Sequence, residues 1–241
     1  MPELPEVETV RRGLSRVTRY QPIRGGDVLL NRTIAHPVSI ENFLAAITGA
    51  EITSWQRRGK YLLAGLERQH QPAGWLGSHL RMTGQLLWVQ QSMPVSSHCR
   101  VRLFFDHNQE LRYVDQRTFG RLWWVPPEIQ PEQIMTGLQR LGPEPFSIEF
   151  SLYYMQAWFK RRQRPVKNAL LDQAMVAGIG NIYADEALFL SGIRPEVKCD
   201  RISLARLKRL HTSIRKVLTD SIEAGGTTFS DFRDIHGTNG N

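Results

Sequence analysis

The spacing of apolar residues near the N-terminus is that of a helix. Apolar side chains recur at steps of three or four, while Glu and Arg occupy the other positions: Leu4, Val7, Val10, Leu14 and Val17. This period places one apolar stripe on a helix, and Pro5 suits the first turn. We therefore expect a helix over residues 3–16 and, from a similar pattern, another over 40–47.

From about residue 27 to residue 125 the pattern changes to short apolar runs separated by Gly, Pro, Asn and Asp. The clearest runs lie at 61–63, 86–89, 101–105, 111–114 and 122–125. Short runs bounded by turn residues are typical of an antiparallel sandwich or barrel. Residues 106–110, DHNQE, separate two of these runs and are expected to form a hairpin loop.

A cluster of prolines divides this β-rich half from the C-terminal half of the chain. The five prolines surround one short predicted helix at 133–141: Pro126, Pro127, Pro131, Pro143 and Pro145. Beyond them, helical spacing returns at 166–175, 182–190 and 204–222, and Gly225-Gly226 would end the last helix. We therefore predict an α+β protein with a β-sandwich domain at 1–128, a hinge at 129–150, a helical domain at 151–229 and a mobile tail at 230–241.

The composition indicates what kind of partner the protein binds and excludes several classes of protein. The 241 residues include 31 Lys and Arg against 23 Asp and Glu, a net charge of +8, which favours a polyanionic partner over a merely solvated basic surface. No apolar run approaches the length that spans a bilayer, and the acidic start is unlike a targeting signal, so a cytoplasmic protein is expected. With two cysteines, Cys99 and Cys199, neither a disulfide framework nor a four-cysteine metal site is expected.

The second residue is a candidate nucleophile. A small residue after Met1 permits removal of the initiator, which would leave Pro2 with a free secondary amine of pKa about 8. Attack on a carbonyl-level carbon would give an iminium ion, whose positive charge makes elimination easy. Glu3 and Glu6 follow and could move protons near the amine. The alternative is a simple helix start whose acids complement the helix dipole.

A second candidate is a basic segment followed by a glycine-rich turn. Residues 160–167, KRRQRPVK, precede two predicted helices that are joined at 178–181, GIGN. Backbone amides at a helix N-terminus bind anions, and Asn181 could add a donor, so this turn could bind phosphate. A helical hairpin with a solvated basic face fits the spacing equally well.

Other candidate residues are scattered through the β-rich half. They are Lys60 in RRGK, His79 and Met82 in SHLRMTG, His98, and Arg117 and Phe119 in DQRTFGR. Taken singly, such methionine and phenylalanine residues are more often core residues, and such histidines are more often structural.

Together these segments are similar to the formamidopyrimidine-DNA glycosylase family, bifunctional base-excision enzymes that remove oxidised purines such as 8-oxoguanine. The matching stretches occur in the family's order: PELPEVETVRRGL, RRGKYLL, HLRMTG, DQRTFG, LGPEP and VAGIGNIYADEALFLSGI. The resemblance implies a catalytic N-terminal β-sandwich, a hinge, and a helical DNA-binding domain with a helix-two-turn-helix motif. It also implies double-stranded damaged DNA as partner, no membrane association, and a monomer.

The resemblance also implies roles for individual residues. Pro2 would attack C1′ of the damaged nucleotide, Glu3 would act as acid and base, Lys60 would assist the later elimination, and Glu6 would lie near the site. The remaining matches fall on DNA-contacting positions (His79, His98, Arg117, Arg162, Lys167 and Asn181) and on the group that fills the gap left by the extruded base (Met82, Arg117 and Phe119).

One feature departs from the family pattern. Members normally carry a C-terminal zinc finger with four cysteines, and the sequence stops at Asn241 before such an element. We expect no bound metal in this chain, and one zinc ion if the full-length protein carries the finger. Two alternatives stay open. One is an endonuclease VIII-type glycosylase for oxidised pyrimidines, and the other is a non-catalytic nucleic-acid-binding protein.

Overall fold

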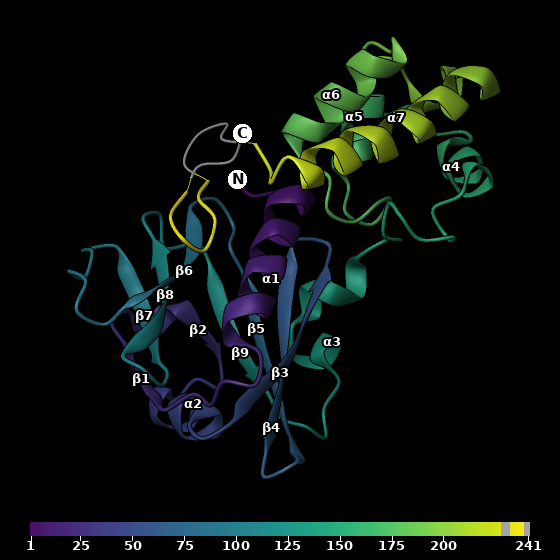
Figure 1. Ribbon diagram of the computed structural model, residues 1–241. Helices are drawn as coiled ribbons and strands as arrows, with labels where there is room; N and C mark the ends of the chain where they lie inside the picture. Colours follow the sequence, from purple (N-terminus) through teal and green to yellow (C-terminus); the bar gives the residue numbers. More distant parts are fainter. Residues whose placement is uncertain (228–231, 239–241) are drawn as a thin grey trace.

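The computed structural model describes residues 1–227 and 232–238 and has two parts, a two-sheet β-sandwich and a group of helices (Figure 1). Helix α1 (Leu4–Thr18) lies along the sandwich, and its N-terminal end reaches the helices. Its buried side carries the predicted stripe, with Leu4, Val7 and Leu14 fully covered. The expected α+β architecture is confirmed.

The sandwich consists of a five-stranded and a four-stranded sheet. The first has the order β2-β9-β5-β4-β3, with β2 (Ile34–His36), β9 (Arg121–Val125), β5 (Gln71–His79), β4 (Tyr61–Arg68) and β3 (Glu51–Arg58). The second has the order β1-β7-β8-β6, with β1 (Gly25–Val28), β7 (Cys99–Phe104), β8 (Gln109–Asp115) and β6 (Gly84–Gln90). All pairs are antiparallel except the short β2–β9 pair, which the antiparallel prediction did not include.

Apolar side chains from both sheets and from helices α1 and α2 (Ile40–Ile47) form the sandwich core. Leu62, Leu76 and Leu111 face inward from their strands and are almost completely buried. Helix α2 has the predicted bounds, with Ser39 as its N-cap. The predicted hairpin joins β7 to β8, and His107 and Asn108 take the positive φ angles of a tight turn.

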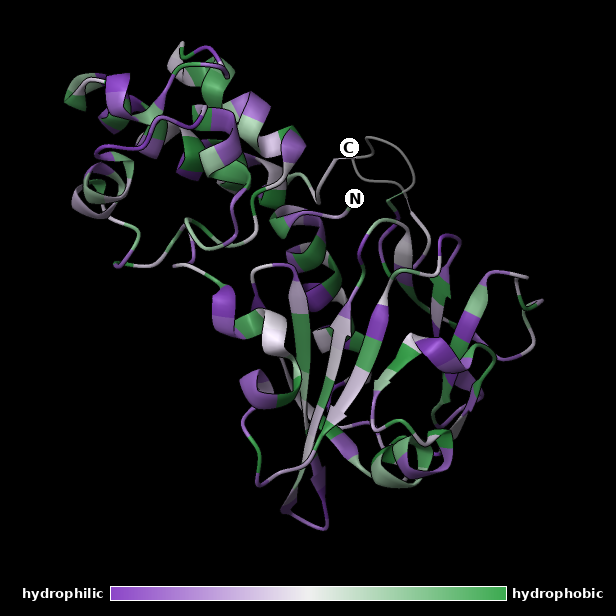
Figure 2. Cartoon of the chain, turned by 180° about the vertical axis from the view of Figure 1, so that it is seen from behind, coloured by the Kyte–Doolittle hydropathy of each residue, from purple (hydrophilic) through white to green (hydrophobic). Residues whose placement is uncertain are grey.

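The proline-rich segment contains two short helices, α3 (Pro131–Ile134) and η2 (Thr136–Arg140). Met135 and Leu138 pack on Tyr61 and Leu63 of β4, so this segment is fastened to the first sheet. The helical part then comprises α4 (Leu152–Phe159), α5 (Val166–Leu171), α6 (Asn181–Ser191) and α7 (Leu204–Glu223), which surround a core of their own. Seen from behind, single helices carry polar and apolar segments side by side (Figure 2), as expected for helices with one buried side.

The C-terminal segment differs from the expected mobile tail. Within 232–238, Phe232 and Ile235 are buried in the sandwich core, and the Trp88 backbone amide donates to the Ile235 carbonyl at 2.8 Å. Residues 232–238 therefore lie against the second sheet. Residues 230, 231 and 239–241 of the predicted tail lie outside the described residues, as do 228 and 229 at the end of the predicted helical domain.

Candidate active site

The N-terminal end of α1 is buried where the sandwich meets the helices. Pro2, Glu3 and Glu6 are all buried there. The Leu4 amide donates to the Gly178 carbonyl at 3.0 Å, which joins the start of the chain to the glycine-rich turn before α6. A Cβ at Gly178 would meet the Leu4 side chain at 2.7 Å, so glycine permits this close approach.

The Glu3 carboxylate occupies the N-terminus of α6. Its Oε2 accepts from the Gly180 amide at 2.6 Å and from the Tyr183 amide at 3.4 Å, and its Oε1 accepts from the Ile182 amide at 2.9 Å. The sequence left open whether these amides bind a phosphate or belong to a simple helical hairpin. In the structure they bind a carboxylate of the same chain, so the anion at this helix N-terminus is Glu3.

Two ionisable groups near this turn have shifted pKa values. Burial raises the pKa of the Glu3 carboxyl, an effect that Lys60 and the α6 amides partly offset. Burial also lowers the pKa of the Lys60 ammonium, and Glu3 and Glu6 partly offset that shift. A raised carboxyl pKa and a lowered amine pKa bring the proton affinities of the two groups closer together, which favours proton transfer.

Glu6 connects α1 with α6 and with Thr227, which follows α7. One oxygen accepts from the Glu3 amide at 2.8 Å, and the other accepts from the Tyr183 hydroxyl at 2.5 Å and from the Thr227 amide at 3.0 Å. The Tyr183 hydroxyl also lies 2.5 Å from the Ser221 hydroxyl. Tyr183 lies within the stretch GIGNIYADEA, but its role was not foreseen because only the fold brings it to Glu6.

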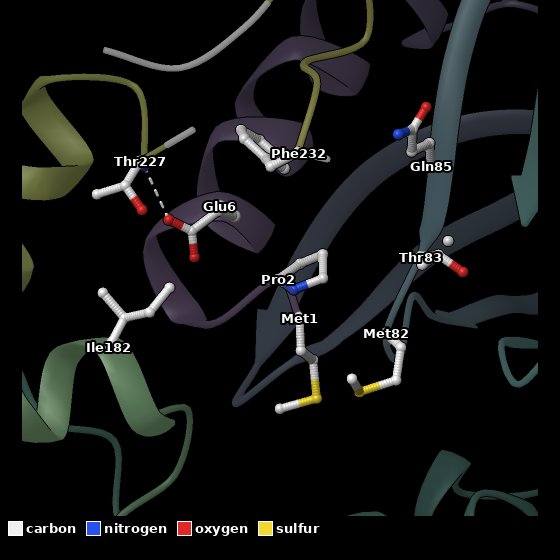
Figure 3. A pocket seen from close by; sticks show the side chains of 10 residues that line it. Met1, Pro2, Glu6, Met82, Thr83, Gln85, Ile182, Thr227 and Phe232 are labelled. Atoms are coloured by element: carbon white, nitrogen blue, oxygen red, sulfur yellow. Dashed lines mark hydrogen bonds between the residues drawn. The ribbon is translucent and has the colours of Figure 1, made fainter. Parts of the chain in front are cut away.

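Pro2 faces a small pocket that the sandwich and the helices share. Met1, Met82, Thr83, Ile182 and Phe232 line it from different segments, with Glu6 at one side bound to Thr227 (Figure 3). The pocket thus brings together the predicted nucleophile, one predicted carboxylate and one predicted gap-filling residue.

A larger cleft of about 530 Å³ lies beside it, between the two parts of the chain. Lys60, His79 and Asn181, three of the predicted site residues, line this cleft. Arg81 and Arg140 also line it and were not predicted, although Arg81 is part of HLRMTG. Their charges make the cleft suited to an anion.

His79 is a neutral member of this cleft. Burial, with the nearby charges of Arg81 and Lys60, lowers its pKa to about 3. Its Nδ1 accepts from the Arg81 amide at 3.0 Å, so Nε2 carries the proton, and Tyr61 packs edge-on against the ring at 4.4 Å between centroids. His79 therefore offers a single N–H donor rather than a charge.

The three predicted gap-filling residues lie at the tips of two loops. Met82 is 39% exposed and Phe119 is 51% exposed, and the Arg117 guanidinium lies over the Phe119 ring at 5.1 Å. Arg81 and Thr118, which precede Met82 and Phe119, have φ angles of 54° and 59°. Non-glycine residues in this region are strained, and such strain is common at binding sites.

The other predicted DNA contacts lie outside the residues that line the cleft. His98 is exposed, with Nδ1 3.3 Å from an Arg100 nitrogen. Arg162 stacks on Trp158 at 3.9 Å, and Lys167 pairs with Asp185 of α6 at 2.8 Å. Arg162 and Lys167 both belong to the segment around the start of α5, on the helical part.

Comparisons with known proteins agree with this arrangement. Residues 1–122 match the model of the formamidopyrimidine-DNA glycosylase N-terminal domain, and residues 141–233 match that of the formamidopyrimidine-DNA glycosylase H2TH domain. The chain belongs to the formamidopyrimidine-DNA glycosylase family. The expected family and an enzymatic function as a DNA glycosylase of base-excision repair are thereby confirmed.

Relatives in this family match the entire chain. The chain is 61% identical to a formamidopyrimidine-DNA glycosylase of Acaryochloris marina over 242 residues and 62% identical to one of Crocosphaera subtropica over 241 residues. Both matches include 100% of this chain and 85% and 84% of the relatives.

Solved structures of the family have the same fold. A Lactococcus lactis enzyme variant bound to Fapy-dG-containing DNA has a TM-score of 0.88 at 31% identity, covering 99% of this chain and 84% of that chain. The enzyme in complex with abasic-site DNA has a TM-score of 0.87 at 31% identity, with coverages of 98% and 84%.

The described residues contain no side-chain cluster that fits the zinc ion of the family's C-terminal zinc finger. Over 1–227 and 232–238, no three His, Cys, Asp or Glu side chains lie together so that they could hold a metal ion. Cys99 is buried in the sandwich and Cys199 in the helical core. No helix in this part of the chain is both long and apolar enough to cross a bilayer.

Proposed function

We propose that this glycosylase removes oxidised purines from double-stranded DNA and then cleaves the strand at the resulting abasic site. The observation that carries the proposal is the position of Pro2. It is buried at the start of α1, beside the helix-bound Glu3 carboxylate, and the Lys60 amine of lowered pKa shares this region. The Lactococcus lactis relative is solved with abasic-site DNA, and a variant of it is solved with Fapy-dG-containing DNA.

The reaction needs Met1 to be removed so that Pro2 carries a free amine. The Pro2 nitrogen then attacks C1′ of the damaged nucleotide, the bond from C1′ to the base breaks, and the base leaves with the electron pair and a proton. Glu3, whose pKa is raised, is the proposed acid. Opening of the sugar ring gives an iminium ion, which acidifies C2′, so that proton loss there expels the 3′ phosphate oxygen. Lys60 is proposed to assist this elimination.

The base must leave the duplex before Pro2 can reach C1′. Unstacking costs a few kcal/mol, which inserted side chains and phosphate contacts offset. Met82 and Phe119, exposed at loop tips, are suited to enter the gap, and Arg117 is proposed to reach the unpaired base. His79 and Asn181 in the cleft, with His98, Arg162 and Lys167 outside it, are proposed to contact the DNA backbone.

Oxidised pyrimidines are the second candidate substrates. The Lactococcus lactis enzyme is also solved with DNA that contains an oxidised pyrimidine, at a TM-score of 0.87 and 31% identity, over 100% of this chain and 85% of that chain. Duplexes with 8-oxoguanine and with thymine glycol, compared at equal enzyme concentration, would decide between them. Faster excision of thymine glycol would contradict the purine preference.

The covalent step can be tested directly. Borohydride reduction during reaction with an 8-oxoguanine duplex should give a stable protein–DNA cross-link, and peptide mass spectrometry should place the adduct on Pro2. Intact-mass measurement should show that Met1 is absent from active protein. An adduct on Lys60, whose pKa is lowered, or full activity with Met1 retained would overturn the role of Pro2.

The proposal includes a monomer that acts on DNA in the cytoplasm, as expected for a protein with bacterial relatives. No step depends on a metal ion. A non-catalytic DNA-binding protein, the alternative from a different class, would bind duplex but form no cross-link.

A further inference from the structure

The loop that carries Met82 and the loop that carries Arg117 and Phe119 are joined through one buried carboxylate. Asp115 is the last residue of β8 and is 1% exposed. Its Oδ1 accepts from the Thr83 hydroxyl at 2.6 Å, and its Oδ2 accepts from the Gly120 amide at 2.8 Å. Each loop therefore contributes one donor to the same side chain.

The Thr83 hydroxyl extends this connection to Arg117. Its oxygen accepts from the Arg117 amide at 3.0 Å while its proton goes to Asp115. The backbone of Asp115 adds a third segment, because its amide donates to the His98 carbonyl at 2.9 Å and its carbonyl accepts from Arg100 Nε at 2.8 Å. Three separate segments that carry predicted DNA contacts thus meet at one residue.

The surroundings of Asp115 leave little room for another arrangement. A Cβ at Gly84 would lie 2.6 Å from the Tyr113 hydroxyl, and a Cβ at Gly120 would overlap that hydroxyl. The same hydroxyl donates to the His79 carbonyl at 3.1 Å. The glycines of HLRMTG and DQRTFG therefore allow both loops to pack against the same buried tyrosine.

We propose that Asp115, acting through Thr83, is a positioning residue that holds Met82, Arg117 and Phe119 in one fixed arrangement for insertion into the duplex. The inference rests on the proposed function, since it concerns how the extruded base is replaced. The strained backbone at Arg81 and Thr118 persists only if the neighbouring structure holds it, and the Asp115 contacts do so. A wedge that is already ordered loses less entropy on entering DNA.

Thr83 offers the sharpest test because its hydroxyl can be removed with little change in shape. In Thr83→Val, single-turnover excision from an 8-oxoguanine:cytosine duplex should fall about tenfold or more, the effect expected for losing hydrogen bonds to a buried charge. Thr83→Ser keeps the hydroxyl and should restore the rate to within about twofold. On an abasic-site duplex, which has no damaged base to extrude, the rate of strand cleavage is the quantity measured. Its fold-decrease in Thr83→Val should be at least about fivefold smaller than the fold-decrease in excision on the lesion duplex.

Thr53→Val is the matched control, because the Thr53 hydroxyl donates to the Gly65 carbonyl in the first sheet, away from the loops. Asp115→Asn is a second probe, and it too should lower the rate on the lesion duplex more than the rate on the abasic-site duplex. Equal losses on both duplexes, or a Thr83→Val enzyme that matches Thr53→Val, would overturn the positioning role. Failure of the wild-type enzyme to form a borohydride cross-link would instead contradict the proposed function.

Discussion

At the scale of single residues, burial shifts the pKa of three ionisable groups in and beside the cleft. Lys60, His79 and Glu3 are each at most 7% exposed, and burial is the largest cause of the pKa shift of each. Desolvation favours the neutral form of all three, so proton transfer and hydrogen bonding there become less costly than in water. The same desolvation should be measurable as a pH-dependent contribution to stability.

The pH dependence of stability can be predicted most directly for His79. Its folded pKa of about 3 lies below the unfolded value of 6.5, so the unfolded chain binds a proton below pH 6.5 that the folded chain rejects until about pH 3. Stability is therefore unaffected above pH 6.5 and falls as pH decreases below it, by about 1.4 kcal/mol per pH unit from this group. Urea unfolding at pH 7.5 and 5.5 should show a larger loss for wild type than for His79→Asn.

Asparagine is the suitable replacement because its Oδ1 can still accept from the Arg81 amide. The loss of stability between pH 7.5 and pH 5.5 should be about 1.4 kcal/mol larger for wild type than for His79→Asn. Equal losses in both proteins would show that His79 is protonated in the fold.

At the scale of elements, local patterns predicted helices and strands better than the contacts between them. Helix α2 has its predicted bounds, and α1 begins one residue later and ends two residues later than the predicted 3–16. Helix α4 was missed because its eight residues, LYYMQAWF, are apolar or aromatic on nearly every side and show no amphipathic period.

The contact between Glu3 and α6 was equally invisible in the sequence. It joins residues 177 to 180 positions apart, and no local period reports on such a pairing. The glycine-rich turn did indicate an anion site, since the chemistry of a helix N-terminus is local. Only the fold reveals that the anion is the Glu3 carboxylate.

Gly180→Ala tests how much this junction contributes. Gly180 has a φ of −131°, which any residue adopts, so alanine would act only through its Cβ, which would overlap the Glu3 carboxyl group. Displacing the carboxylate should cost about 2 kcal/mol of stability and lower excision of 8-oxoguanine about tenfold or more. Chemical denaturation and single-turnover kinetics measure the two effects.

Gly192→Ala is the control for a glycine substitution in the same helix. Gly192 ends α6 with a φ of 65° and has open space around it, so alanine should cost about 1 kcal/mol and leave the excision rate unchanged. If both variants kept full activity, the Glu3 contact with α6 would have no role in catalysis.

At the scale of the whole molecule, partly buried charged side chains join the sandwich to the segment between it and the helical part. Glu144 of LGPEP accepts from the Gly59 amide at 2.6 Å and from Arg58 at 3.0 Å, and it pairs with Arg57 at 2.7 Å. These contacts hold the turn that precedes Lys60. Together with Glu3 and Glu6, they fix the walls of the cleft relative to each other.

The net charge of +8 then acts at long range on a DNA duplex. Phosphate contacts release counterions, so the affinity of a basic protein for DNA falls steeply as salt rises. Arg162 is exposed and is held in place by Trp158, since its Nε donates to the Trp158 carbonyl at 2.5 Å and its guanidinium stacks on the ring. An arginine fixed in this way is suited to a single phosphate.

Arg162→Ala should therefore lower affinity similarly for damaged and undamaged duplexes and should reduce the slope of log K against log salt by about one. Fluorescence anisotropy over a series of salt concentrations measures both quantities. Arg162→Lys keeps the charge and should keep the slope, and Arg24→Ala, which removes an exposed ion pair with Asp106 on the sandwich, should change neither. A loss confined to damaged DNA would mean that Arg162 recognises the lesion and not the backbone, because a phosphate contact carries no information about the base.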